Sequence, residues 1–407
     1  MTSAERRRAL QEGAVLGGGF WVAGTNVQNA GTLEWSLETG AVLRLIGDTN
    51  GWPTDLGTFH HTIHGILEGS DDITLLYAGV RTIALGERPT MLSCTTLAWG
   101  SQITTRTRWS RAVYETANLA AWVADTGLDR HQAKSGVTDG IVMRAPHRRR
   151  LRLPRGDSAL VTEHEAGPFG YRLDWSVRVQ QRLVVNVRRG ATLEDLHDRY
   201  AIPLICFTSF ASDRPDCLIT EVVLNPTSGE RAEIWRTGPR YEPDPWRPGH
   251  GYVFWAEEVP RLSAAFTRWW RLHAMSPALG LFADHINLGL TYSQPRFLTL
   301  YTAMEGYCRS RLGQKDFKRM REHAGVDDSV HGCSKAALRL IAESRNYVAH
   351  LSNQHVSPQE IIDTLPDSTR RAHALMQACL LRDIGFGRRQ VETMLRRYHA
   401  NWPLPLV

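Results

Sequence analysis

The chain has 407 residues, of which 42% are hydrophobic and 22% are charged. This balance is typical of globular proteins and excludes wholesale disorder, and the length corresponds to two or three domains of about 150 residues. No segment approaches the roughly 18 consecutive apolar residues of a membrane-spanning helix. Gln11, Glu12 and Gly13 interrupt the apolar stretch that a signal peptide would need. We therefore expect a cytoplasmic protein that does not associate with membranes.

The six cysteines form no CxxC pair, and they are too sparse for a disulfide scaffold in a chain of this length. Small, apolar thiols of this kind usually fill space in a core. We expect them to be reduced and mostly buried.

The net charge of +6 is distributed unevenly along the chain. Residues 1–250 carry 28 basic and 28 acidic side chains, whereas residues 251–407 carry 20 basic and 14 acidic ones. A basic C-terminal part is consistent with binding to a polyanion such as nucleic acid. The same excess could be spread over a solvated surface, so the charge alone leaves both interpretations open.

The first 240 residues have the pattern of an antiparallel, β-rich domain. Short segments rich in β-branched and aromatic residues alternate with turns rich in Gly, Asn and Asp, which is typical of a sandwich or barrel. Thr192, with Asp195 three residues later, predicts the start of a helix of one to three turns, which Pro203 would stop or kink. Strands are predicted at residues 20–27, 32–37, 41–46, 59–67, 73–80, 171–179, 182–188, 217–224 and 231–236.

A second domain is predicted after residues 238–249, which are so rich in Pro and Gly that neither a helix nor a strand can run through them. Beyond this segment, apolar residues recur with the 3.6-residue period of helices. Helices are predicted at residues 260–275, 294–312, 335–351, 368–382 and 388–398. The sequence therefore predicts an α+β protein of two domains, a β-rich domain at residues 1–240 and an all-α helical bundle at residues 251–407.

One helical segment carries a group of residues with a specific chemical meaning. Asn346 and His350 lie four residues apart on one helix face, and Arg345 lies about 100° around the axis from Asn346. A fixed cation, an amide and a group that titrates near neutral pH are the parts needed to cleave RNA without a metal. One group takes the 2′-hydroxyl proton, one protonates the leaving oxygen, and the guanidinium stabilises the phosphorane. These residues leave open which group is the acid and which the base.

The chain resembles the ApeA-like anti-phage defence proteins of the HEPN superfamily in both halves. In the C-terminal half, the resemblance rests on Arg345-Asn346-x-x-x-His350, which matches the family's ribonuclease motif, and on the helix of residues 296–309. In the N-terminal half, it covers roughly residues 15–236. It rests there on GFWVAG, on the hairpins GTLEWSLETGAVLRLIG and HGILEGSDDITLLYA, and on the helix ATLEDLHDRY.

The resemblance implies an endoribonuclease whose HEPN-like helical domain forms a homodimer and brings two motifs to one composite cleft. It also implies RNA as the partner, with transfer RNA as a target, in an abortive response to phage infection. Arg345, Asn346 and His350 would be catalytic without any cofactor, and Glu305 would orient Arg345 from the neighbouring helix. Because the first half has no catalytic constellation, we expect it to act as a sensor or restraint, with a phage-encoded protein as the trigger.

The charged residues near the motif allow two interpretations. Glu305 and Arg309 are four residues apart and could form an ordinary surface ion pair. The densest basic run of the helical half could follow an RNA backbone, or it could be a solvated loop. This run consists of Arg309, Arg311, Lys315, Lys318, Arg319 and Arg321.

A second basic run alternates with Leu151 and Leu153. This alternation favours an edge strand protected by charge over an RNA contact. Its members are Arg144, Arg148, Arg149, Arg150, Arg152 and Arg155.

Two functions of other classes remain open. The first is a non-catalytic, dimeric adaptor whose β-rich domain recognises a ligand or a protein. The second is a metal-dependent hydrolase that uses His60, His61 and His64. On a strand, His60 and His64 share a face while His61 points away, and no cluster of Cys or carboxylates completes a site. We therefore expect no metal.

Overall fold

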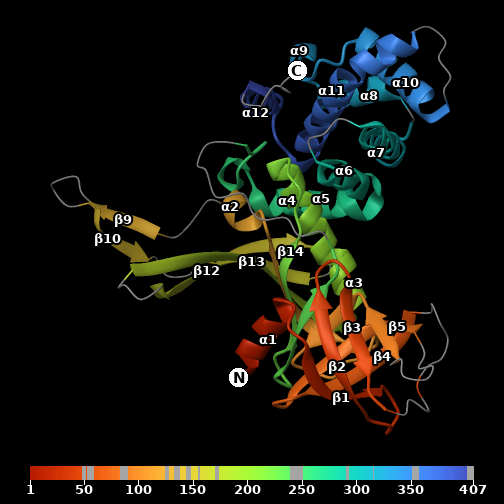
Figure 1. Ribbon diagram of the computed structural model, residues 1–407. Helices are drawn as coiled ribbons and strands as arrows, with labels where there is room; N and C mark the ends of the chain where they lie inside the picture. Colours follow the sequence, from red (N-terminus) through yellow and green to blue (C-terminus); the bar gives the residue numbers. More distant parts are fainter. Residues whose placement is uncertain are drawn as a thin grey trace. The chain divides into compact units, whose positions relative to one another are not determined.

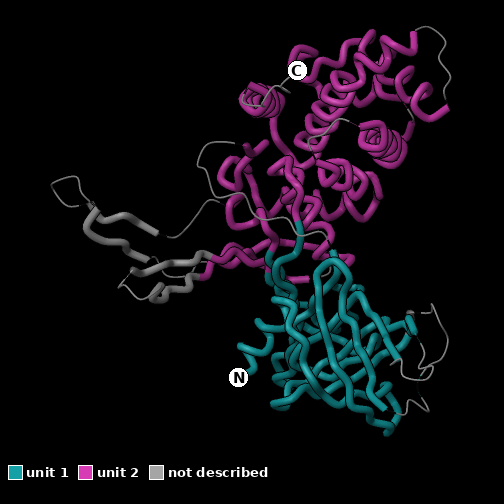
Figure 2. Tube along the Cα trace, viewed as in Figure 1, with its two compact units in different colours: residues 1–115, 184–197, 217–241 teal, residues 116–183, 198–216, 242–407 magenta. Residues whose placement is uncertain are grey.

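The computed structural model describes residues 1–47, 52, 59–82, 90–123, 128–132, 138–143, 148–154, 156–169, 174–238, 251–289, 293–314, 316–350 and 357–400 (Figure 1). The chain divides into two compact units, each assembled from several segments (Figure 2). Unit 1 contains residues 1–115, 184–197 and 217–241, and unit 2 contains residues 116–183, 198–216 and 242–407. Unit 2 therefore also includes segments that precede the predicted linker at residues 238–249. Most of this linker lies outside the described residues.

Unit 1 is built around a closed antiparallel barrel, which confirms the predicted β-rich N-terminal architecture. Strand β5 pairs with both β4 and β6, so the order β5-β4-β1-β2-β3-β6 returns to β5 and closes the barrel. Closure leaves these strands without an open edge. The six strands are β1 (Leu16–Val22), β2 (Asn29–Ser36), β3 (Gly40–Leu45), β4 (Phe59–Leu67), β5 (Asp71–Thr82) and β6 (Met91–Cys94).

The interior of the barrel follows from the two-residue period of its strands. In β2, Leu33 and Trp35 are buried, while the residues between and after them are partly exposed. Phe20 of β1 is fully buried. A Cβ at Gly65 of β4 would lie 2.6 Å from its ring, so only glycine fits at this position without a shift.

Further strands extend the sheet beyond the barrel in the order β8-β14-β15-β7-β5. The short helix α1 (Ser3–Gln11) belongs to the same unit, and its Arg7 forms an ion pair with Glu233 at 2.5 Å. The added strands are β7 (Thr96–Trp99), β8 (Trp109–Thr116), β14 (Leu218–Asn225) and β15 (Glu230–Arg236).

Unit 2 is mainly helical, as predicted for the C-terminal part. Its helices are α2 (Leu119–Val123), α4 (Ile202–Ser212), α5 (Leu262–Met275), α6 (Ala278–Asn287), α7 (Gln294–Leu312), α8 (Phe317–Ala324), α9 (Asp328–His331), α10 (Lys335–His350), α11 (Pro358–Ile384) and α12 (Arg388–Ala400). An aromatic core joins α4 to α5. Phe210 stacks on Trp269 with a centroid distance of 5.5 Å, and Phe207 meets the same indole edge-on at 5.4 Å. Among the described residues, no helix combines the length and the apolarity that crossing a membrane requires.

The helix predicted after Thr192 differs from expectation at Pro203. Helix α3 (Leu193–Leu196) is followed by the π-helical turn η1 (His197–Ala201) and then directly by α4. Pro203 stands near the start of α4, directly after this π-helical turn, so helical backbone continues through the proline. Helix α4 beyond the proline was not predicted.

The basic segment around Leu151 is an edge strand, as predicted. Strand β11 (Arg148–Leu153) stands at the end of the sheet order and pairs with β12 (Gly156–Phe169), which is followed by β13 (Asp174–Ala191). Leu151 and Leu153 are buried, while Arg150 and Arg152 are exposed. The backbone amide of Arg152 donates to Ser263 of α5 at 2.9 Å, so this helix covers part of the edge. Strands β9 (Leu128–Gln132) and β10 (Thr138–Met143) form a separate hairpin.

Candidate active site

The C-terminal end of α10 presents the predicted motif. Ile341 and Ser344 are fully buried on the face of this helix that packs towards α11. Arg345 is half-buried at the margin of that face, and Asn346 and His350 are exposed. The helical period therefore holds three polar side chains at the surface of the helical unit, as the spacing predicted.

The three motif side chains are in direct contact. Arg345 Nη1 lies 2.9 Å from His350 Nε2 and donates to Asn346 Oδ1 at 3.3 Å. A guanidinium can only donate hydrogen bonds, so Nε2 of His350 is the acceptor and carries no proton in this arrangement. The imidazole therefore presents the form of a general base beside a fixed positive charge.

Tyr301 of α7 contacts the motif through its ring. The Arg345 guanidinium carbon lies 5.8 Å from the centre of the Tyr301 ring, within the range of a cation–π contact. Burial raises the pKa of Tyr301 to about 12; the Glu305 carboxylate adds to this increase and Arg345 opposes it. Both charges therefore act on the same phenol. The Glu305 carboxylate also lies 4.0 Å from Arg309, which is the surface pair that the sequence allowed.

The basic run after α7 is divided by its contacts. Arg311 forms a 3.0 Å ion pair with Asp383, which is only 4% exposed and also accepts from Tyr307 and His323. Arg311 therefore contributes to the packing of α7 against α11, while its side chain stays 43% exposed. The exposed residues of the same run are Arg309, Arg311, Lys318 and Arg319, and Lys315 lies outside the described residues.

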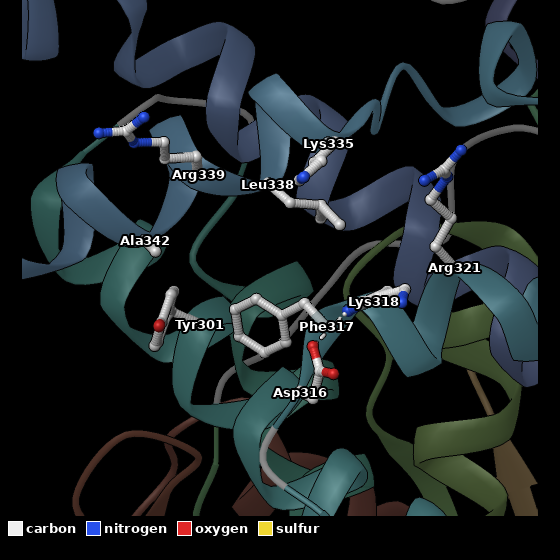
Figure 3. Close-up of a pocket in the computed structure, with 9 residues that line it drawn as sticks. All are labelled: Tyr301, Asp316, Phe317, Lys318, Arg321, Lys335, Leu338, Arg339 and Ala342. Carbon is white, nitrogen blue, oxygen red and sulfur yellow. Dashed lines mark hydrogen bonds between the residues drawn. The ribbon is translucent and has the colours of Figure 1, made fainter.

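A cavity of about 440 Å³ opens between α7, α8 and α10 (Figure 3). Tyr301 and Phe317 lie on one side of it, and Leu338 and Lys335 of α10 lie on the opposite side. Neither Tyr301 nor the cations Lys335 and Arg339 of α10 were predicted as site residues. The position of the two cations is readable from the helical period, because they share a face with Asn346. The lining residues are Tyr301, Asp316, Phe317, Lys318, Arg321, Lys335, Leu338, Arg339 and Ala342.

The histidines of β4 have ordinary structural contacts where they are described. His64 Nε2 lies 2.9 Å from the carbonyl oxygen of Ile103, and its ring meets Trp21 edge-on at 6.0 Å. The side chain of His60 lies outside the described part of the chain. No group of three or more His, Cys, Asp or Glu side chains that could hold a metal ion occurs among the residues described. In the second basic run, Arg144 and Arg155 are not among those residues.

Comparison with known proteins gives one match. Residues 308–390 match the family model of the Apea-like HEPN domain, and this range contains Arg345, Asn346 and His350. Tyr301 and Glu305 precede the matched range. No curated protein and no solved structure matches this chain.

Proposed function

Because the chain carries an Apea-like HEPN domain, we propose that it is an endoribonuclease whose reaction centre is the motif of α10. The observation that carries this proposal is the 2.9 Å contact between Arg345 and His350 at an exposed helix end. Within the matched range, this contact joins a fixed cation to an unprotonated imidazole nitrogen.

The proposed reaction is transfer of the RNA phosphate to the neighbouring 2′-oxygen. When Arg345 Nη1 turns from His350 Nε2 to a phosphate oxygen, Nε2 takes the 2′-hydroxyl proton, the 2′-oxygen bonds to phosphorus, and the bond to the 5′-oxygen breaks. Arg345 stabilises the charge that develops on the phosphate oxygens, and Asn346 holds the guanidinium in place. The products are a 2′,3′-cyclic phosphate and, after protonation of the leaving oxygen, a 5′-hydroxyl.

Glu305 is proposed as a positioning residue for Arg345. It is 14% exposed and lies one helical turn after Tyr301, whose ring Arg345 covers. The Glu305 carboxylate and the Arg345 guanidinium both act on this phenol, and the attraction between their opposite charges restricts the position of the guanidinium. Loss of Glu305 is therefore expected to lower the rate of cleavage more than the affinity for RNA.

Homodimerisation through the helical unit is part of the proposal. The reaction requires one proton to be removed and one to be delivered, but a single motif contributes one histidine. A two-fold axis beside α10 would bring a second Arg345 and a second His350 to the same cleft without any new residue.

The substrate and the biological role are proposed from the family. Transfer RNA or another structured RNA would be the target, in a response that stops phage growth at the expense of the infected cell. The exposed cations Arg309, Lys318 and Arg319, together with Arg311 and Lys315, are proposed to contact the RNA backbone. Unit 1, which shows no comparable arrangement among its described residues, would hold the nuclease silent until a phage-encoded trigger binds.

Incubation of the purified full-length chain with total RNA tests the proposal. We expect discrete fragments, with the transfer RNA fraction depleted before ribosomal RNA. The matched control is Arg389→Ala, which removes an exposed arginine of α12 away from the motif and should cut like the wild type. Intact RNA that is nevertheless bound would favour the non-catalytic adaptor instead.

A further inference from the structure

The cavity between α7, α8 and α10 lies on the same helix face as the motif. Counted from Lys335, the residues Arg339, Ala342, Asn346 and His350 follow at offsets of 4, 7, 11 and 15. These five positions fall within about 80° of one another around the helix. The wall of the cavity therefore forms one continuous stripe with Asn346 and His350, with Arg339 about 10 Å from Asn346 along the axis.

Cations surround this cavity. Lys335 and Arg339 are exposed and have no carboxylate partner among the described residues. Lys318 has only a 3.8 Å surface pair, and Arg321 is held by Asp328 at 2.6 Å. The one carboxylate in the lining, Asp316, caps α8 by accepting from the Lys318 amide at 2.8 Å. The positive charge of Lys335 and Arg339 is thus available to a phosphate.

The floor of the cavity is aromatic. Phe317 is partly exposed and meets Tyr301 edge-on with a centroid distance of 5.0 Å. Tyr301 is 8% exposed and lies under Arg345, so it connects the cavity to the motif by direct contact. In Figure 3 the Phe317 ring extends into the space that faces Leu338. Aromatic side chains beside cations are the usual platform for a single-stranded base and its phosphate.

We propose that this cavity binds one nucleotide, with the base against Phe317 and the phosphate on Lys335 and Arg339. Its volume of about 440 Å³ falls within the range of about 300–1,000 Å³ that small-molecule sites occupy. Within the proposed function, on which this inference rests, the nucleotide is a neighbour of the scissile phosphate on the same RNA strand. The cavity then fixes how the strand lies along α10.

Binding of a non-cleavable probe tests the proposal. The probe is a fluorescent, single-stranded 2′-O-methyl oligonucleotide, which the full-length chain can bind but not cut because it has no 2′-hydroxyl. Phe317→Leu, which keeps apolar volume but removes the ring, should weaken binding roughly fivefold or more. Arg339→Gln should weaken binding and lower the slope of log affinity against log salt by about 0.7. Phe317→Tyr and Arg389→Gln, the matched controls, should bind like the wild type, and melting curves verify folding.

A second arm titrates adenosine 5′-monophosphate to distinguish a strand from a free nucleotide. Loss of oligonucleotide binding in the variants assigns the cavity to an RNA strand. Loss of mononucleotide binding with unchanged oligonucleotide binding assigns it to a free nucleotide. Unchanged binding of both probes overturns the proposal. If the wild type cleaves RNA and the cavity variants bind both probes normally, the proposed nuclease activity stands and the nucleotide site is wrong. If the wild type does not cleave RNA but the cavity variants lose binding, the nucleotide site stands and the proposed nuclease activity is wrong.

Discussion

His373 Nε2 lies 2.9 Å from Asp213 Oδ1, and the two side chains are only 2% and 5% exposed. The contact belongs to a chain of hydrogen-bonding groups inside unit 2. His373 Nδ1 lies 3.0 Å from His285 Nε2, and His285 Nδ1 lies 3.1 Å from the carbonyl oxygen of Arg296. Tyr398 donates to the other Asp213 oxygen at 2.7 Å.

The carboxylate of Asp213 stays ionised in spite of its burial. Burial alone would raise the pKa of Asp213, but the charge and hydrogen bond of His373 outweigh it and lower this pKa to about 2.

Acid is therefore expected to destabilise unit 2. Burial, with the charge of His373, lowers the pKa of His285 from 6.5 to about 3, and burial lowers that of His399 to about 4. Below pH 6.5 the unfolded chain binds protons that the folded chain excludes. The free energy of unfolding should fall by about 1.4 kcal/mol per pH unit for each such histidine, and below about pH 4 the Asp213 contribution is lost as well.

Urea denaturation followed by helical circular dichroism between pH 7 and pH 4 measures this dependence. In His285→Asn, the slope of the free energy of unfolding against pH should be smaller by the contribution of one histidine. A flat profile in the wild type would contradict the assignment of neutral, buried histidines.

Asp383→Asn should destabilise the helical unit by about 3 kcal/mol. Burial would raise the pKa of Asp383, but hydrogen bonds from His323, Tyr307 and Arg311 outweigh it and hold the pKa below its ordinary value. The amide would leave these partners without a charged acceptor. Asp367→Asn is the matched control, because that carboxylate is 44% exposed and its ion pairs are worth less than about 1 kcal/mol. Equal effects in chemical denaturation would contradict a central role for Asp383.

The fold class was predictable because the spacing of apolar residues and the amino-acid composition both change along the chain. Alternation in segments such as residues 32–37 predicted strands, and the 3.6-residue period predicted α7 and α10 within one or two residues of their observed bounds. Helix α4 was missed because Pro203 reads as a helix end, whereas here helical backbone continues through it. Closure of the barrel depends on β5 pairing with two strands, which is a long-range property that local pattern does not encode.

The motif was predictable to the residue because one helix supplies Arg345, Asn346 and His350. The cavity was not, because its walls come from three helices and its aromatic floor depends on how α8 packs beside α7. Arg311 counted as an RNA contact in the sequence, while in the structure its nearest anion is the buried Asp383. Packing between helices assigns such partners, and a single sequence does not record them.

Cleavage should persist in excess EDTA and leave 2′,3′-cyclic phosphate ends. A histidine base and an arginine cation supply proton transfer and charge stabilisation without a divalent ion. End-specific repair with a phosphatase that opens cyclic phosphates, followed by ligation and sequencing, identifies the ends. Activity that EDTA abolishes and Mg²⁺ or Zn²⁺ restores would return the metal-dependent hydrolase to consideration.

The active form should be a dimer. Light scattering on the full-length chain, at the concentrations at which RNA is cut, should give twice the mass of 45.8 kDa. The composite cleft also predicts that the rate per chain falls on dilution, because both motifs are needed together. A monomer with a constant rate per chain would require each chain to hold a complete site.

The most direct test of the account is the single-turnover cleavage rate of Arg345→Ala and His350→Ala on one defined RNA. Each variant should lose at least about 100-fold in rate, because general base catalysis and charge stabilisation each contribute that much or more. Both side chains lie at the C-terminal end of α10, at the surface of the helical unit. The melting temperatures of the two variants, and that of Arg389→Ala, should therefore stay close to that of the wild type. Rates within a few-fold of the wild type in either folded variant would contradict the assignment of this motif as the reaction centre.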